Sequence, residues 1–349
     1  MVVFERLVIK PFLASSLFLF ILCFMEESTK RFRKILVAVV AMLVAVVATA
    51  CSSKSSSSKE NYTPKSLTIQ FVPSQAATKL QARAKPLEKM LSKRLGIPVH
   101  VSMSTDYNTV VEAMKSKKVD VGFLPPDGYV LAHKQGAADL LLQAERWGVK
   151  QPGGKATKDL VKNYRAEILV KKGSKIKSWK DLKGKSISVQ NPTSSAGYVF
   201  PVAELKEKGL DVTKDSKLVT VTGHDQAVLN VLNGDTDAAF VFEDARNTVL
   251  KDNPKIMSQV VPIYFTKPIP NDTISVIPSM SKSFRKKLAK AFIAVGKSKE
   301  GRKVIESVYS HEGYDYAKDS DFNIVRKYDK MVESCLLYTS DAADDLLCV

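Results

Sequence analysis

Apolar and polar residues follow two alternating patterns along most of the chain. Short apolar runs bounded by turn residues predict buried β-strands, because strands of this kind are short and rich in valine, isoleucine and phenylalanine. The expected strands are Ser66–Val72, Val99–Ser102, Val119–Phe123, Ala166–Lys171, Ser186–Val189, Leu218–Val221 and Ala238–Phe242.

Between these runs, apolar residues recur every three or four positions, which predicts amphipathic helices. The expected helices are Thr78–Leu95, Tyr107–Lys117, Tyr129–Gln135, Ser195–Lys208, Asp225–Leu232, one from Asp244, Ser283–Ala294 and Lys299–Tyr309. Strands that alternate with helices predict α/β architecture with parallel sheets flanked by helices, and ligands at the carboxyl ends of the strands. We expect two such lobes with a cleft between them.

The pattern is different near the start of the chain. A basic cluster at 30–34 precedes the apolar run 35–47, and Ala48-Thr49-Ala50-Cys51 follows. This order is typical of a bacterial lipoprotein signal, and the run is too short to span a bilayer comfortably. We therefore expect residues 1–50 to be a cleaved signal peptide that starts at Met25, behind a spurious N-terminal extension. A plain secretory signal and a second membrane segment before Met25 are the alternatives.

Cys51 is then the expected lipidation site, carrying diacylglycerol and palmitate, and residues 51–64 form a flexible linker of serine and lysine. This places the protein on the extracytoplasmic face of the cell membrane. Residues 335–349 match translated sequencing-adapter DNA, so we interpret them as an assembly artefact. A genuine acidic tail is the alternative.

Composition narrows the chemistry. Of the 4 cysteines, only Cys51 belongs to the expected mature protein, which excludes an internal disulfide and a cysteine metal site. The 4 histidines show no metal-ligand spacing, so we expect no metal and no cofactor. The net charge of +17 favours an anionic ligand or an anionic cell envelope, or is simply a solvated lysine-rich surface. The lysines are scattered without interleaved aromatic residues, so we expect no nucleic-acid partner.

Four sequence motifs carry a family resemblance. They are Asp106-Tyr107-Xaa-Xaa-Val-Val-Glu-Ala-Met114, Val119-Asp120-Val-Gly-Phe-Leu124, Asn191-Pro-Thr-Ser-Ser-Ala-Gly-Tyr198 and Gly223-His224. In order and spacing they resemble the phosphate, phosphite and phosphonate substrate-binding lipoproteins of ABC importers.

The resemblance implies a two-lobed periplasmic-binding-protein-like (type II) fold with the ligand in the interlobe cleft. Lobe 1 would be 65–165 plus 273–334, and lobe 2 would be 166–272. It also implies a phosphonate or related phosphorus oxyanion as ligand, an ABC permease and its ATPase as partners, a monomer, and no enzyme activity. Closure would use two crossover segments near Glu167 and Asp272.

Serine residues mark the first candidate binding element. Ser194 and Ser195 follow an expected strand and open a helix, where N–H groups and the helix dipole favour an anion. A plain helix cap is the alternative from the residues alone. The resemblance implies that Ser194 and Ser195 hold phosphonate oxygens beside the Ala196 amide.

His224 follows another expected strand, and the resemblance makes it a donor to the phosphonate, charged or neutral according to the bound anion. The adjacent Asp225 is interpreted as a helix N-cap. Tyr107 and Tyr164 match positions that line the cleft, with packing in the core or surface as the alternative. Ser74, Gln75 and the loop Pro125-Pro126-Asp127 are further cleft candidates, while Tyr129 is expected to pack within its helix.

Asp244 and Asp272 match family positions that face the far end of the ligand. Carboxylates fit an anion site only where the ligand has a cationic amine or a protonated phosphorus oxygen. Glu243 is a neighbouring candidate, since strand alternation sends one of the two acids into the cleft. Asp244 as a helix cap is the alternative.

Three other functions remain open from the residues. One is a phosphite- or phosphate-specific binding lipoprotein. Another is a serine hydrolase that uses Ser195, His224 and Asp244, although the chain lacks a Gly-Xaa-Ser-Xaa-Gly elbow. The last is a surface adhesin.

Overall fold

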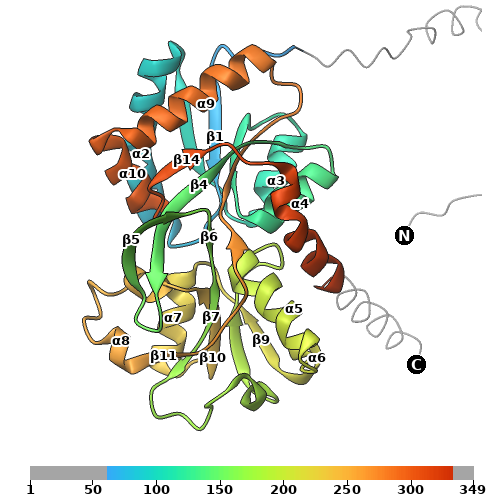
Figure 1. The fold of residues 1–349 in the computed structure, drawn as a ribbon, viewed down its shortest axis with the longest axis vertical. Coiled ribbons are helices and arrows are strands. Elements are labelled where there is room, and N and C mark those ends of the chain that lie inside the picture. The colour runs from blue at the N-terminus through green and yellow to red at the C-terminus, as the bar shows by residue number, and fades with distance from the viewer. Residues whose placement is uncertain (1–60, 333–349) are drawn as a thin grey trace, which may run out of the picture. The chain divides into compact units, whose positions relative to one another are not determined.

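A computed structural model of the chain describes residues 61–332. These residues form two main β-sheets, each flanked by helices (Figure 1). The expected signal peptide, Cys51, most of the linker and the segment 335–349 lie outside the described residues. Within the described residues, no helix combines the length and apolar character needed to cross a membrane.

The first sheet has seven strands. Its main path runs β14, β4, β13, β3, β1, β2, and β5 pairs with the far half of β4. The bounds are β1 (Leu67–Phe71), β2 (Val99–Met103), β3 (Val121–Leu124), β4 (Asp139–Lys150), β5 (Lys155–Val161), β13 (Thr273–Val276) and β14 (Gly313–Asp315).

The second sheet has five strands, in the order β11, β7, β10, β8, β9. The bounds are β7 (Ala166–Lys171), β8 (Ser186–Val189), β9 (Lys217–Thr220), β10 (Ala238–Phe242) and β11 (Val260–Phe265). The strands of the first sheet thus come from 67–161 and 273–315, and those of the second from 166–265. The proposed lobe boundaries fit this distribution and stay a prediction.

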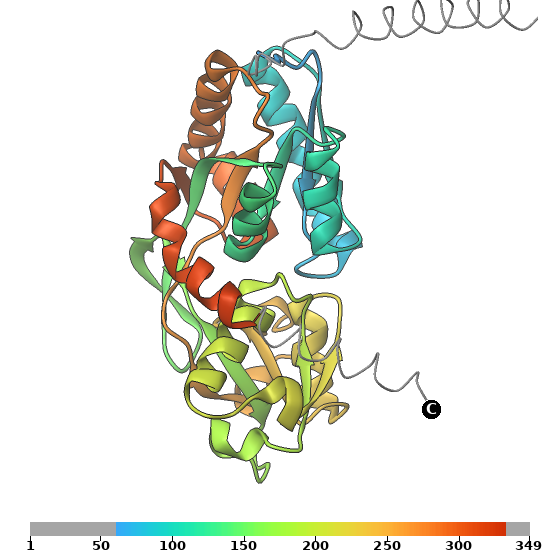
Figure 2. The ribbon, with the colours of Figure 1, turned by 90° about the vertical axis from the view of Figure 1, so that its right-hand side faces the viewer.

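Sheet order determines where the helices lie. β1 has β2 on one side and β3 on the other, both parallel to it. Right-handed crossovers in these opposite directions place α2 and α3 on opposite faces of the sheet (Figure 2). The helices are α2 (Ala77–Leu95), α3 (Tyr107–Lys115), α4 (Pro126–Lys134), α5 (Phe200–Glu207), α6 (Val212–Asp215), α7 (His224–Asn233), α8 (Ile256–Gln259), α9 (Lys282–Lys297) and α10 (Lys299–Tyr309).

The helices form where their apolar stripes meet the sheets. In α2, the buried residues recur at helical spacing, and Gly96 ends the helix in the left-handed conformation at φ 71°. These buried residues are Leu80, Ala84, Leu87, Leu91 and Leu95.

Two expectations need correction. Both sheets are mixed rather than wholly parallel, because β13, β4 and β14 in the first sheet and β7 and β11 in the second run antiparallel to their neighbours. The expected helix from Asp244 is a short 3-10 turn, Ala245–Thr248, and the Asp244 side chain does not cap it.

Several segments connect the two sheets. β6 (Asn163–Tyr164) and β12 (Ile269–Pro270) pair side by side where the chain crosses between them. The tip of the β4–β5 hairpin also contacts the second lobe, because Arg246 donates to the carbonyl oxygen of Pro152 at 2.8 Å. Farther along, the helical segment 323–332 packs Tyr328 against Phe200 in α5, at 4.8 Å between ring centroids.

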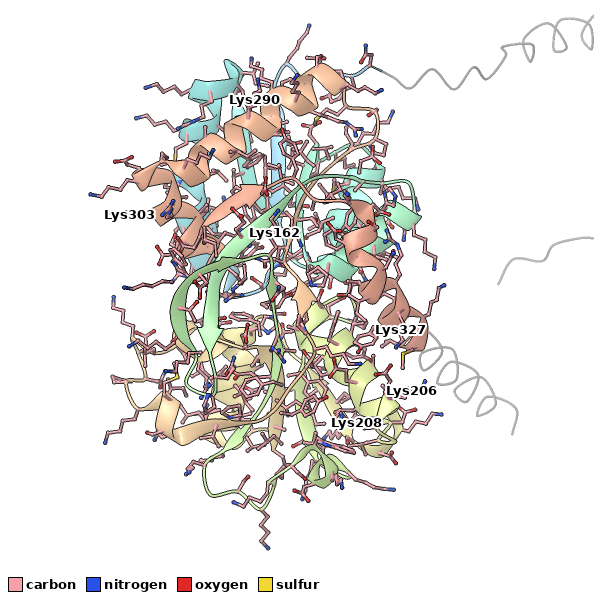
Figure 3. All side chains as sticks on the ribbon, in the orientation of Figure 1. Lys162, Lys206, Lys208, Lys290, Lys303 and Lys327 are labelled. Carbon is pink, nitrogen blue, oxygen red and sulfur yellow. The ribbon has the colours of Figure 1, made fainter. Side chains whose placement is uncertain are left out.

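The lysines do not concentrate at one place. Figure 3 labels Lys290 on α9, Lys303 on α10, Lys327 on the segment 323–332, and Lys206 and Lys208 at α5, spread over both lobes. Lys290, Lys303, Lys208 and Lys327 are exposed. This distribution matches a solvated basic surface.

Candidate ligand-binding site

A cavity of about 50 Å³ lies where strand ends from both sheets meet. Residues just after β1, β3, β8 and β9, and Phe242 at the end of β10, contribute to its wall. In α/β sheets the carboxyl ends of strands form such crevices. The lining residues are Val72, Ser74, Gln75, Tyr107, Pro125, Arg146, Tyr164, Ser194, Ser195, Ala196, His224, Phe242, Asn271, Asp272, Tyr309 and Ser310.

The serine turn between β8 and α5 forms one wall. Ser194 caps a turn of π-helix, Ser195–Val199, by accepting a hydrogen bond from the Gly197 N–H at 3.3 Å. The first N–H groups of this helical segment have no partner within the helix and are oriented to bind an anion. Ser194, Ser195 and Ala196 are all buried and line the cavity, as the sequence motif predicted.

Gln190 connects the serine turn to the His224 loop. Its side chain exchanges two hydrogen bonds with the Gly223 backbone, at 3.0 and 3.2 Å. Gly223 has φ 92°, a conformation that favours glycine, and a side chain there would collide with Asp225 and approach Gln75. The backbone N–H of His224 then donates to the carbonyl oxygen of Ser74 in the first lobe at 2.9 Å.

His224 is buried in the wall of the cavity. Its ring packs edge-on against Phe242, with centroids 4.8 Å apart, and its Nδ1 has no hydrogen-bond partner within the described residues. Burial lowers the pKa of His224 to about 3. The imidazole is therefore neutral near pH 7 and can offer one N–H to an anion.

Three tyrosines contribute hydroxyl groups. Tyr107 and Tyr164 line the cavity together with Ser194 and Ser195. Burial is the main cause that raises the pKa of Tyr107, Tyr164 and Tyr309, so all three hydroxyls stay protonated. Sequence reasoning missed Tyr309, which lies at the end of α10 and reaches the cavity only through the packing of that helix.

The carboxylate of Asp272 lines the cavity beside Asn271. It lies 3.4 Å from Nε2 of His311, a contact that becomes an ion pair when the histidine is protonated. Asn271 is fixed by its side chain, which donates to the Ala144 carbonyl oxygen at 3.1 Å. The structure thus places Asp272 at the crossover, in the wall of the cavity.

Asp244 differs from its expected position. It is not among the residues that line the cavity, and its Oδ1 lies 2.5 Å from a terminal nitrogen of Arg146. Glu243 does not line the cavity either, because it accepts hydrogen bonds from Gln151 at 2.5 Å and from the Arg165 N–H at 3.1 Å. Both acids that follow β10 are thus occupied by protein groups.

Arg146 is the charged lining residue that sequence reasoning missed. It is 5% exposed, and its guanidinium lies 5.6 Å from the Tyr164 ring centroid. Burial disfavours its charge, but the Asp244 carboxylate, with smaller contributions from Glu243 and Tyr164, outweighs this effect, so the pKa of Arg146 is raised. A signal was present in the sequence: Leu142, Ala144 and Arg146 alternate along one strand, so the arginine occupies a position expected to face inward.

Of the remaining candidate residues, some line the cavity and others do not. Ser74, Gln75 and Pro125 line the cavity, whereas Tyr129 packs within the first lobe and donates to Asp319 at 2.6 Å. Asp225 does not cap its own helix. Its Oδ2 instead accepts the Ala76 N–H at 3.2 Å, immediately before α2 in the first lobe.

The hydrolase arrangement is not assembled in the described residues. The Ser195 hydroxyl accepts the Asp127 N–H at 3.3 Å, His224 Nδ1 has no partner, and Asp244 pairs with Arg146. A triad needs the acid hydrogen-bonded to the histidine that orients it. These side chains therefore lack the hydrogen bonds of a nucleophile, base and orienting acid.

The chain resembles known proteins in sequence. Residues 69–322 match the family model described as ABC transporter, phosphonate, periplasmic substrate-binding protein. The phosphate-import protein PhnD of Mycolicibacterium smegmatis is 32% identical over 217 residues, which cover 59% of this chain and 65% of that protein. The phosphonates-binding periplasmic protein of Escherichia coli is 22% identical over 246 residues, covering 69% and 70%. The chain thus spans about two thirds of the length of these relatives.

Solved structures show the same fold. PhnD1 from Prochlorococcus marinus, in complex with methylphosphonate, aligns with a TM-score of 0.67 at 19% identity. The alignment covers 78% of this chain and 99% of that one. The expected periplasmic-binding-protein (type II) fold is confirmed.

The serine turn yields a first prediction, at Gly197. A Cβ on Gly197 would lie 2.6 Å from Gln190 Cβ and closer still to its Cγ, so Gly197→Ala must displace Gln190. We expect a loss of about 1–3 kcal/mol in the free energy of unfolding, measured by urea titration. Gly153→Ala is the matched control, because nothing lies within 4 Å of its added methyl group. Equal stability of the two variants would contradict this role of Gly197.

His224 yields a second prediction, on pH. Between the ordinary pKa of 6.5 and the folded value of about 3, the unfolded chain binds a proton at His224 that the folded chain does not. The resulting stability is fully present above pH 6.5 and falls as pH falls, by up to about 1.4 kcal/mol per unit. In urea unfolding from pH 7.5 to 5, wild type should lose stability faster than His224→Gln. Parallel pH profiles would show that His224 titrates normally.

Proposed function

The chain belongs to the family of periplasmic substrate-binding proteins of phosphonate ABC transporters, and from this we propose that it captures a phosphonate or related phosphorus oxyanion outside the cytoplasmic membrane. The captured ligand passes to a membrane permease driven by an ATPase. Phosphate and phosphonates appear in the names of the two curated relatives, which supports a phosphorus oxyanion as the ligand class.

One observation carries this proposal. Hydroxyl groups, helix N–H groups and a neutral imidazole converge on one small buried cavity, in the contacts of Ser194, Ser195 and His224. A tetrahedral phosphorus oxyanion has several oxygens that accept hydrogen bonds, and donors already fixed in place bind it without reorganisation. The Tyr107 and Tyr164 hydroxyls are protonated and extend the set of donors.

Binding follows from the arrangement of the lobes. Ser195 belongs to the second lobe and is hydrogen-bonded to Asp127 of the first, while the His224 N–H reaches Ser74 across the same boundary. A ligand held by groups of both lobes favours the closed arrangement, with β6 and β12 as the crossover segments. The proposed role requires no catalysis, and a monomer suffices for it.

The remaining expectations complete the proposal. Lobe 1 comprises 65–165 plus 273–334, lobe 2 comprises 166–272, and lipidation at Cys51 tethers the protein to the extracytoplasmic face of the membrane. The donor set, with Ser194, Ser195, Ala196, His224, Tyr107 and Tyr164, forms the anion end of the site.

Thermal unfolding with added ligand tests the function. A ligand that binds only the native state raises the midpoint, so phosphate, phosphite, methylphosphonate or 2-aminoethylphosphonate should shift it. Ser195→Ala removes a hydrogen bond to a charged ligand, worth about 1.5–3 kcal/mol, and should weaken affinity about 10- to 100-fold.

Ser258→Ala is the control, because that serine is exposed on α8 and contacts its own helix region. It should leave the shift unchanged. The proposed function is wrong if no phosphorus oxyanion moves the midpoint of the wild-type protein.

A further inference from the structure

We propose that Arg146 determines which class of ligand this site binds. Arg146 forms an ion pair with the Asp244 carboxylate, so the guanidinium, and not that carboxylate, lines the cavity. The ligand is then a compact phosphorus oxyanion that carries no cationic amine. This inference rests on the proposed function and narrows it to phosphate, phosphite or a short alkylphosphonate.

The pair joins two lobes and is largely out of water. Arg146 lies on β4 of the first sheet, and Asp244 follows β10 of the second. Their side chains are 6% and 13% exposed, and the nitrogen and oxygen lie 2.5 Å apart. At this burial a carboxylate with a bound guanidinium is not available to a second cation, because separating the pair would leave both charges desolvated.

Glu243 does not replace Asp244 as an acid that lines the cavity. Glu243 is engaged by Gln151 and the Arg165 N–H, which leaves Asp272 as the carboxylate among the described lining residues. Arg146 and Asp272 both line this cavity, whereas Asp244, which balances the charge of Arg146, does not. An ammonium group brought into this cavity would meet a guanidinium close by, and like charges repel most strongly where water is excluded.

Arg146 also has an unused donor. Its Nε is buried and has no hydrogen-bond partner within the described residues. A buried N–H of a charged group is costly to leave unpaired, and an oxyanion is its strongest acceptor. The planar guanidinium can thus hold Asp244 through its terminal nitrogen and still donate from Nε.

Arg146 further limits ligand size. A second cavity of about 480 Å³, which is more open, shares Arg146 and Ser310 with the ligand cavity and is lined also by Trp147, Asp244 and Asn247. Arg146 therefore belongs to the wall between the two spaces. A long substituent on phosphorus that extended past Arg146 into the second cavity would have to displace this side chain from Asp244.

Calorimetric titration of the full chain tests the inference. We expect wild type to bind methylphosphonate or phosphite at least tenfold more tightly than 2-aminoethylphosphonate. Arg146→Met should weaken methylphosphonate binding tenfold or more, and it should free Asp244 to bind an amine. The preference for methylphosphonate over 2-aminoethylphosphonate should therefore fall or reverse. The double variant with Asp244→Asn should lose that gain for the aminophosphonate.

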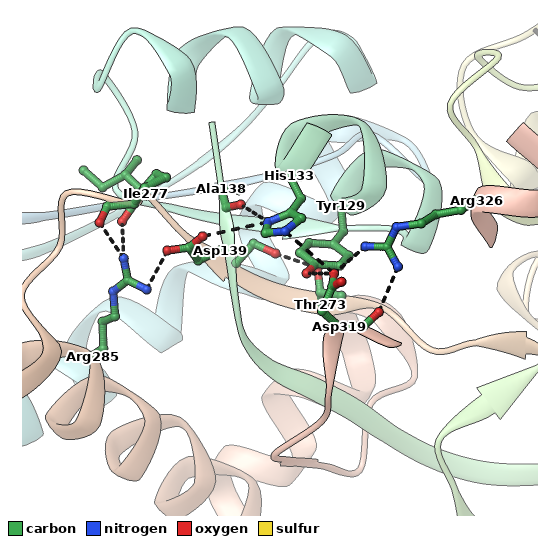
Figure 4. Close-up of polar contacts among 11 residues, drawn as sticks. Tyr129, His133, Ala138, Asp139, Thr273, Ile277, Arg285, Asp319 and Arg326 are labelled. Carbon is green, nitrogen blue, oxygen red and sulfur yellow. Dashed lines mark hydrogen bonds and ion pairs between the residues drawn. The ribbon is translucent and has the colours of Figure 1, made fainter. Parts of the chain in front are cut away.

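Arg285→Met is the matched control. Arg285 pairs with Asp139 at 2.8 Å on the outer part of the first lobe (Figure 4), and neither residue lines the cavity. This variant should keep the wild-type ratio. Arg146→Lys provides a second test that retains the positive charge: it lacks Nε, so it should weaken methylphosphonate binding while still disfavouring the amine.

The outcomes separate the two claims. Wild type that binds 2-aminoethylphosphonate as tightly as methylphosphonate overturns the role of Arg146 and leaves the proposed function intact. An unchanged ratio in a folded Arg146→Met variant overturns it as well. Failure of every phosphorus ligand to bind would remove both proposals.

Discussion

Buried arginines need opposite charges, and this constraint organises the region between the two lobes. Arg246 is 2% exposed and lies 3.4 Å from Glu167, which is itself fully buried. The same guanidinium donates to the carbonyl oxygens of Val260 and Pro152. It thereby joins β7, β11 and the tip of the β4–β5 hairpin. Such a buried charge is tolerated because its terminal nitrogens donate to Val260, Pro152 and Glu167.

The hairpin in turn positions the ligand cavity. Its tip contacts the second lobe at Pro152 and at Gly154, whose carbonyl oxygen accepts from Asn247 at 3.0 Å. Its first strand, β4, begins in the first sheet and carries Arg146 to the cavity on the way. The serine turn and His224 are fixed separately, by the hydrogen bonds of Gln190 to Gly197 and to Gly223. The serine turn and His224 on the second lobe, and the guanidinium on the first, are thus held by independent structural elements.

Local features could be predicted from the sequence, and long-range ones could not. The serine turn, His224 and Tyr107 follow strand ends in recognisable motifs, so strand order alone brings them to one place. Asp244 was assigned to the cavity because it matches a family position, and such a match describes one chain segment at a time. Its actual partner, Arg146, lies 98 residues away in the sequence, in a segment without a family motif. Tyr309 was missed for the same reason, since it depends on how α10 packs.

The ion pair between Arg146 and Asp244 also has a practical consequence, since it spans the two lobes. It joins protein groups of both lobes, so it favours the closed arrangement independently of any contact with the ligand. A ligand can move only those molecules that are still open. A fluorescent reporter built on lobe movement would therefore start from a high background and have a narrow dynamic range, and loosening this single pair would widen it.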